Sequence, residues 1–152
     1  MRRTLAALTA AVAALAPTTP AHALPGWSYE DCATAGHDFA LHTVGLTPDP
    51  PAAGQGFTVR LAGTVVRTIE SGALAHVSID VGDLTVISRT YDLGQELAQT
   101  DPSLRLPLTP GFYTIPFDFP GSLPKQVFRI RIRVDNADEH HAACVDLSLD
   151  LR

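Results

Sequence analysis

The sequence predicts an all-β protein built as a sandwich of antiparallel strands. In several short segments apolar residues alternate with polar ones, which is the pattern of strands that bury one face. The 11 Gly and 12 Pro residues are scattered along the 152-residue chain, as turns between short strands require. No long amphipathic helix pattern interrupts them. Seven short strands at this spacing are typical of a β-sandwich.

The first 23 residues have the pattern of a secretory signal peptide. Arg2 and Arg3 supply a positive start, Leu5–Leu15 is an apolar stretch, and Ala21–Ala23 offers the small-x-small pattern that signal peptidase accepts. This stretch is shorter than the roughly 20 apolar residues that span a bilayer, which argues against a membrane anchor. We therefore expect a secreted, extracellular domain of residues 24–152.

The strands of this domain are expected in a regular order. In chain order they lie at Phe39–Leu46, Gln55–Thr68, Ala73–Val81, Leu84–Tyr91, Phe112–Phe119, Gln126–Asn136 and Ala142–Leu151. Pro48–Pro51 forms a stiff turn, and Val81–Leu84 forms a tight one. Gly94–Pro110 has no clean period, so we expect a loop there, with one helical turn at Gln95–Ala98.

The last two strands are the clearest. In Gln126–Asn136, apolar residues alternate with Arg129, Arg131 and Arg133, so one face is apolar and the other is cationic. Ala142–Leu151 alternates in the same way. The short polar link between the two segments predicts that they pair as a hairpin.

Alignment of the apolar faces sets the register of this hairpin. Pairing Ile132 with Val145 places Arg131 opposite Asp146, which gives an ordinary cross-strand ion pair. The stripe of arginines has two interpretations. It is either a solvated face, which is the commoner case, or a patch for an anionic lipid or a protein partner.

Cys32 and Cys144 are the two cysteines of the chain. In an oxidising compartment an even pair predicts one disulfide, and this one encloses almost the whole domain. A disulfide that closes a loop of that size stabilises the folded state by about 4–5 kcal/mol in the chain-entropy model. Two free thiols or a metal site are the alternatives, although the absence of a CxxC spacing argues against a metal.

Charge and motifs argue against nucleic-acid binding and against catalysis. The net charge is −5 with 11 Lys and Arg, whereas nucleic-acid binders are normally basic. Asp138–His141 offers four possible metal ligands in a row, but adjacent side chains diverge in a hairpin loop. Ser122–Lys125 matches S-x-x-K, but Pro124 is incompatible with the helix that this motif needs. We therefore expect no enzyme, no catalytic residues, no metal and no cofactor.

Several short pieces of the chain occur in a distinctive order after the signal peptide. They are Cys32, Leu46–Pro51 with Gly54, Val59–Val66, Ile69–Ala73, Tyr91–Leu93, Leu106–Leu108 with Gly111, Ile115–Pro116, Pro124, Phe128–Asn136 and Ala143–Cys144. With this order and spacing the chain resembles the ML (lipid-recognition) family. Within that family it is most similar to the phosphatidylglycerol/phosphatidylinositol transfer proteins and the Niemann–Pick type C cholesterol-binding protein.

The sequence departs from this family at one place. Similar proteins carry a Cys directly after the Asp-Leu pair and another directly before the Pro-Leu pair, and here these positions are Gly94 and Leu106. A second disulfide is therefore missing, while the Cys32–Cys144 pair is kept. The resemblance places Gly94–Pro110 near a pocket mouth. We expect this segment to be the most mobile internal part of the chain and to control access to the pocket.

The resemblance implies an immunoglobulin-like sandwich of seven to eight strands with an apolar cavity between its sheets. Strand faces rich in Ala and Val leave space there, and a dry apolar gap binds hydrocarbon. Ile115, Phe117 and Phe119 are the best candidates for the lining, and Tyr113 is expected at the mouth. The full set of expected ligand-binding residues is Val59, Leu61, Val65, Val77, Ile79, Leu108, Tyr113, Ile115, Phe117, Phe119, Phe128, Ile130, Ile132, Val145 and Leu147.

Two functions remain open at this point. The first is a secreted lipid-binding or lipid-transfer protein that holds a single phospholipid or sterol-like lipid, contacts membranes transiently and works as a monomer. The second is an extracellular immunoglobulin-like adhesion or protein-binding module with a solid core. Lipid that co-purifies with the folded protein favours the first function, and a flat exposed patch over a packed core favours the second.

Overall fold

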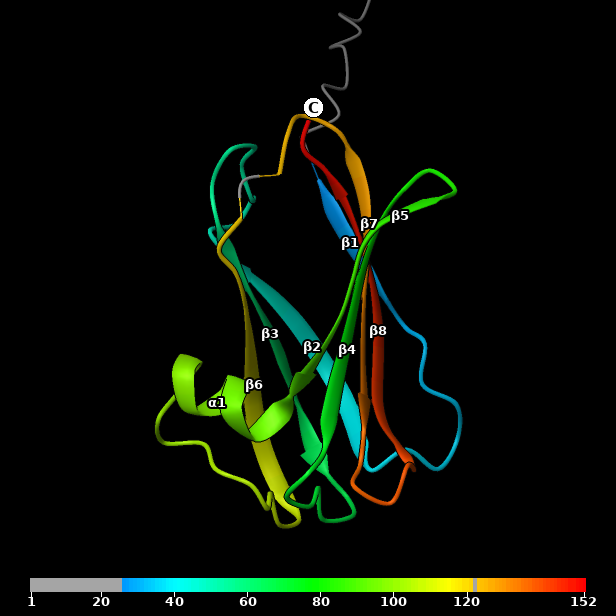
Figure 1. Cartoon of the computed structure of the whole chain (residues 1–152), viewed down its shortest axis with the longest axis vertical. Coiled ribbons are helices and arrows are strands. Elements are labelled where there is room, and N and C mark those ends of the chain that lie inside the picture. The colour runs from blue at the N-terminus through cyan, green and yellow to red at the C-terminus, as the bar shows by residue number, and fades with distance from the viewer. Residues whose placement is uncertain (1–25, 122) are drawn as a thin grey trace, which may run out of the picture.

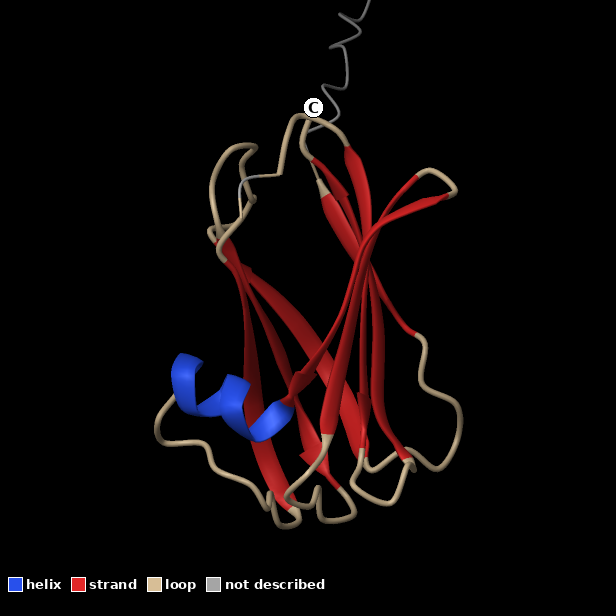
Figure 2. Ribbon diagram, viewed as in Figure 1, coloured by secondary structure: helices blue, strands red, loops and turns tan. Residues whose placement is uncertain are grey.

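Two antiparallel sheets face each other in the computed structural model, which describes residues 26–121 and 123–152 (Figures 1 and 2). The five-stranded sheet has the order β1-β8-β7-β4-β5, and the three-stranded sheet has the order β2-β3-β6. The strands are β1 (Trp27–Asp31), β2 (Phe39–Thr47), β3 (Phe57–Val65), β4 (Leu74–Val81), β5 (Leu84–Asp92), β6 (Gly111–Phe119), β7 (Val127–Asp135) and β8 (His141–Asp150). The predicted all-β sandwich is confirmed.

Helix α1 (Leu93–Thr100) follows β5 and lies beside β6 (Figure 2). Among the described residues, no helix has both the length and the apolar character needed to cross a membrane. The predicted signal peptide, residues 1–23, lies outside the described residues.

The seven predicted strands are all present, and two further features correct the prediction. Strand β1 was not expected, because Trp27–Asp31 is a largely exposed edge strand without apolar alternation. The loop expected at Gly94–Pro110 begins with α1, which is longer than the single helical turn expected there. The Asp92 side chain accepts a hydrogen bond from the Gln95 amide at 2.9 Å, and Leu93 and Leu97 are buried one turn apart. Two apolar residues were too few to show a helical period.

The register predicted for the β7–β8 hairpin is confirmed. Ile132 lies opposite Val145, and Arg131 lies opposite Asp146. The guanidinium group of Arg131 donates two hydrogen bonds of 2.7 Å to the Asp146 carboxylate. Because half of the Arg131 side chain is exposed, this pair contributes little to stability.

The core lies between the inward faces of the two sheets. Strands β7 and β8 alternate buried and outward residues along almost their whole length, and β3 does the same from the opposite sheet. The predicted Cys32–Cys144 disulfide is confirmed and joins the segment after β1 to β8.

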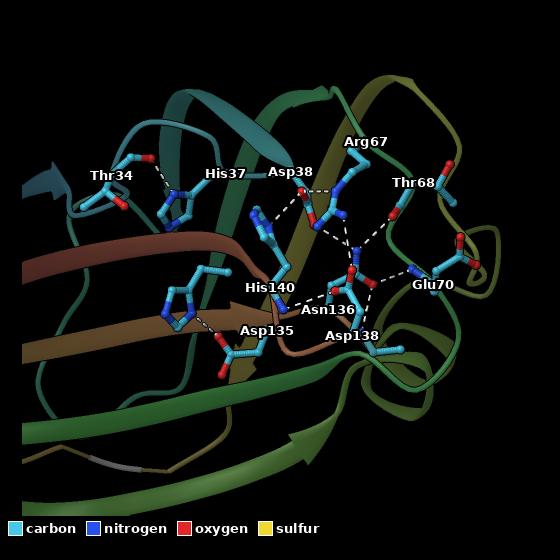
Figure 3. Close-up of polar contacts among 12 residues, drawn as sticks. Thr34, His37, Asp38, Arg67, Thr68, Glu70, Asp135, Asn136, Asp138 and His140 are labelled. Atoms are coloured by element: carbon cyan, nitrogen blue, oxygen red, sulfur yellow. Dashed lines mark hydrogen bonds and ion pairs between the residues drawn. The ribbon is translucent and has the colours of Figure 1, made fainter.

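A buried polar network joins the two sheets at one end (Figure 3). Asp38 precedes β2 of the three-stranded sheet, and its side chain is 1% exposed. Arg67 donates to its two carboxylate oxygens at 2.7 and 3.0 Å. Asn136, which follows β7 of the five-stranded sheet, donates to the same carboxylate at 2.8 Å. His140 adds a contact of 3.2 Å between its Nδ1 atom and Asp38.

Asn136 extends this network to the backbone of the connection between the two sheets. Its side-chain nitrogen also donates to the Thr68 carbonyl at 2.9 Å, and its side-chain oxygen accepts from the Glu70 amide at 2.8 Å. Both partners belong to the connection from β3 to β4. The network therefore anchors the end of the sandwich where β3 and β7 finish.

We expect Asp38→Asn to lower the free energy of unfolding at pH 7 by about 1–3 kcal/mol, because the buried carboxylate that accepts from Arg67 and Asn136 loses its negative charge. Burial opposes ionisation of Asp38, but the hydrogen bonds from Arg67 and Asn136 and the charge of Arg67 outweigh it and lower the pKa of Asp38. Because the pKa of Asp38 is lower in the folded chain, its ionised carboxylate stabilises the fold at pH values above the ordinary Asp pKa of about 4. This stabilisation is lost as the pH falls through the pKa of Asp38 in the folded chain.

Urea unfolding of both proteins at pH 7 and across pH 5 to 2 measures this effect. The difference between them should shrink as the pH falls below about 4. Asp83→Asn, in the exposed turn between β4 and β5, is the control and should unfold like the parent protein. A constant difference across this pH range would contradict the assignment.

Candidate functional site

A pocket of about 490 Å³ lies between an edge of each sheet. Edge strand β5 and its neighbour β4 form one wall, and edge strand β6 forms the other. Helix α1 and the segment after β6 complete the lining. The lining residues are Val77, Ile79, Ile87, Tyr91, Glu96, Gln99, Thr100, Phe117, Asp118, Phe119, Pro120, Gly121 and Leu123.

The deep wall of the pocket is apolar because of strand alternation. Val77 and Ile79 are inward residues of β4, and Phe117 is a buried residue of β6. Phe119 stacks on Phe57 of β3 with ring centroids 5.0 Å apart. These side chains give the pocket a mainly hydrocarbon surface, which is suited to an apolar ligand.

Helix α1 supplies most of the polar side of the pocket. Its buried residues Leu93 and Leu97 fix its rotation against the sandwich. Glu96, Gln99 and Thr100 are spaced three and four residues apart, so they share the face that lines the pocket.

Two acidic residues line the same pocket, half-buried Glu96 from α1 and exposed Asp118 from β6. Burial of Glu96, together with the negative charge of Asp118, raises the pKa of Glu96 above its usual value. Asp118 accepts a hydrogen bond of 2.6 Å from the Thr58 hydroxyl. The polar side of the pocket is therefore acidic.

The structure brings only some of the expected ligand-binding residues to this pocket. Val77, Ile79, Phe117 and Phe119 line it. Tyr113 is half-buried outside the lining, with its hydroxyl 3.4 Å from that of Thr109. The others are buried in the core outside the lining, and they are Val59, Leu61, Val65, Leu108, Ile115, Phe128, Ile130, Ile132, Val145 and Leu147.

Sequence reasoning missed the contributions of β5 and α1. Ile87 and Tyr91 lie on a strand whose residues are all exposed, so alternation gave no sign of a lining role. The available signal for α1 was Asp92 as an N-cap residue before Leu93 and Leu97. The predicted helical turn at Gln95–Ala98 already contained Glu96, and the N-cap signal would have extended it to the full length of α1.

The two histidines considered as metal ligands point to different carboxylates. His140 contacts Asp38, whereas His141 forms a hydrogen bond of 2.7 Å with Asp135. Within residues 26–121 and 123–152, no group of three or more His, Cys, Asp or Glu residues is arranged to hold a metal ion. Ser122 of the S-x-x-K pattern lies outside the described residues.

The segment from Gly94 to Pro110 is held to the body through Leu108, which pairs with Ile69. The amide of Leu108 and the amide of Ile69 donate to each other's carbonyls at 2.9 and 3.0 Å. A Cβ atom built on Gly94 would lie 3.4 Å from the Cδ1 atom of Leu106. The two positions that carry a second disulfide in similar proteins are therefore adjacent here.

Comparisons with known proteins agree with this architecture. A family model described as the ML domain matches residues 26–151. A phosphatidylglycerol/phosphatidylinositol transfer protein from Cryptococcus neoformans var. neoformans serotype D is 32% identical over 126 residues, which are 82% of this chain and 70% of that protein. A protein of the same name from Candida albicans is 32% identical over 130 residues, covering 83% and 67% of the two chains.

Two solved structures share the fold. Chicken MD-1, crystallised with lipid IVa, has a TM-score of 0.57 at 20% identity and covers 82% of this chain and 88% of its own. A Niemann-Pick type C2 protein from the Japanese carpenter ant has a TM-score of 0.62 at 14% identity, covering 80% and 96%. At these identities the likeness concerns the fold.

We expect a Gly94→Cys, Leu106→Cys variant to form a disulfide, because the side chain of Leu106 reaches to within 3.4 Å of a Cβ atom built on Gly94, and a disulfide joins side chains that meet in this way. Intact mass after alkylation under non-reducing conditions measures it, with single Gly94→Cys as the control. Hydrogen exchange across Gly94–Pro110 should be faster than in Phe128–Val134 in the parent and should slow in the double variant. Two alkylatable thiols in the folded double variant would contradict the predicted proximity.

Proposed function

The chain belongs to the ML-domain family, and on this premise we propose that it binds a single lipid between its two sheets and transfers it. The observation that carries the proposal is the pocket of about 490 Å³ with its apolar wall. Small-molecule sites are typically concave, about 300–1,000 Å³ in volume and mostly apolar. The names of the curated relatives support lipid transfer as the activity.

The pocket explains how a lipid is held without covalent chemistry. Each CH₂ group that leaves water for an apolar site gains about 0.8 kcal/mol. Val77, Ile79 and Phe117 supply such a site in the interior, while Tyr91 and Gln99 provide hydrogen-bonding groups. Binding of this kind needs no catalytic residue, and we propose that the protein is not an enzyme.

The alternative function was an adhesion module with a solid core. A solid core packs its inward residues against each other, whereas Val77 and Ile79 of β4 face the pocket. This arrangement favours lipid binding over adhesion.

We further propose that the protein is exported and works as a monomer in transient contact with membranes. The Cys32–Cys144 disulfide supports export, because disulfides persist in oxidising compartments. Leu84 and Val86 of edge strand β5 are 66% and 47% exposed, and such apolar side chains support contact with a lipid surface.

Val77→Phe tests lipid binding directly. The larger side chain takes up pocket volume, and loss of room for two CH₂ groups weakens binding about tenfold. Its effect on the free energy of unfolding should stay below about 1 kcal/mol, because it fills space and does not overpack the core. Titration with a fluorescent lipid and thermal unfolding are measured on the same samples.

Val59→Phe is the matched control, because Val59 is fully buried outside the pocket lining. There the same change overpacks the core and should cost about 1–3 kcal/mol. Unchanged lipid binding by Val77→Phe, or absence of binding by the parent protein, would overturn the proposed function and favour the adhesion module.

Export has its own measurement. The 152-residue chain expressed from Met1 should appear outside the cell with Leu24 as its first residue, as read by intact mass and amino-terminal sequencing. The change Ala21→Asp, Ala23→Asp removes the small residues that signal peptidase accepts and should prevent this cleavage. Retention of the uncleaved parent chain inside the cell would contradict export.

A further inference from the structure

The polar side of the pocket carries negative charge without a compensating positive charge. Glu96 and Asp118 line it, and the other polar lining side chains, Tyr91, Gln99 and Thr100, are neutral at pH 7. Among the described lining residues there is no Lys, Arg or His. A ligand that enters between the sheets therefore meets half-buried Glu96 and exposed Asp118, and no cationic residue among the described lining.

The surroundings of the two carboxylates leave this charge available to a ligand. The charged group that acts on Glu96 is Asp118, which is itself acidic. Asp118 is held by Thr58, a neutral hydroxyl donor, at 2.6 Å. Glu96 is half-buried, so its charge is less well solvated than a surface carboxylate and interacts more strongly with a nearby group.

We propose that the pocket selects amphiphiles whose polar end donates hydrogen bonds and carries no negative charge, and that Glu96 and Asp118 are the residues that set this preference. The inference rests on the proposed lipid-binding function and specifies its ligand class. Amines and alcohols share the required chemistry, because both offer donors to a carboxylate. An ammonium group gains charge attraction as well.

An anionic polar end is disfavoured for the complementary reason. Like charges within about 4–6 Å repel and shift a carboxylate towards its neutral form. The curated relatives are named for phosphatidylglycerol and phosphatidylinositol, whose headgroups are anionic. The acidic lining therefore predicts a ligand preference for this chain that differs from the names of its relatives.

The test uses three fluorescent amphiphiles with the same pyrene-labelled alkyl chain and different ends. One ends in a primary amine, one in an alcohol and one in a carboxylate, and each is titrated against the full mature protein at pH 7. The amine and the alcohol should each bind at least about tenfold more tightly than the carboxylate. The ratio between amine and alcohol shows which donor the two acidic residues prefer.

A charge-neutral variant separates the two carboxylates from the rest of the pocket. In Glu96→Gln, Asp118→Asn the carboxylate-ended probe should gain about tenfold in affinity, while the alcohol changes by less than about twofold. The Asn side-chain oxygen can still accept from Thr58, so the local hydrogen bond is kept.

The matched control is Glu30→Gln, Asp83→Asn, which makes the same change in net charge at exposed positions outside the lining. It should keep the parent preference, because the effect depends on position and not on the overall charge. Equal shifts in both double variants would overturn the assignment to Glu96 and Asp118.

The outcomes separate this inference from the proposed function. Tight binding of all three probes by the parent, weakened by Val77→Phe, would leave lipid binding standing and overturn the charge preference. Binding of none of the probes would overturn both. A preference of the parent for the amine and alcohol over the carboxylate would establish the inference if Glu96→Gln, Asp118→Asn abolishes this preference and the control keeps it.

Discussion

The buried carboxylate of Asp38 is the constraint on which the arrangement of the two sheets depends. A buried charge is tolerated only with partners, and here they come from the ends of β3 and β7, which belong to different sheets. The sheets are therefore held together where β3 reaches Val65. The pocket lies toward the opposite end of β6, where Phe119 pairs with Phe57. Because the Asp38 network joins the sheets at one end of the sandwich, the sheets can stay apart at the other end, where the pocket lies.

Strand periodicity predicted the fold because each central strand buries one face and exposes the other. The arginines of β7 alternate so regularly with apolar residues that even the register with β8 followed from the sequence. Strand β1 was not predicted because an edge strand is held by backbone hydrogen bonds to β8. Such bonds require no pattern in side chains such as those of Trp27–Asp31. Helix α1 was predicted only as one turn at Gln95–Ala98, because its contact with the sandwich rests mainly on Leu93 and Leu97.

The site was less predictable than the fold because inward orientation and pocket lining are different properties. Val59 and Val77 both face inward by alternation, yet Val59 is packed in the core and Val77 faces the pocket. The difference depends on where the sheets separate, which is set by contacts between distant segments such as Asp38 and Asn136. The acidic side of the pocket depends on the contact between α1 and β6, which no local sequence pattern predicts.

The position of the pocket between two sheet edges bears on the kinetics of exchange. Strands β5 and β6 end their respective sheets on this side, so the backbone ladders of both sheets are complete without a bond across the gap. A ligand can therefore leave without rupture of inter-strand hydrogen bonds. The barrier to departure then comes mainly from rewetting of its alkyl chain, at about 0.8 kcal/mol per CH₂. Residence time should accordingly grow by roughly fourfold with each added carbon, so the length of the alkyl chain sets how long a ligand stays bound.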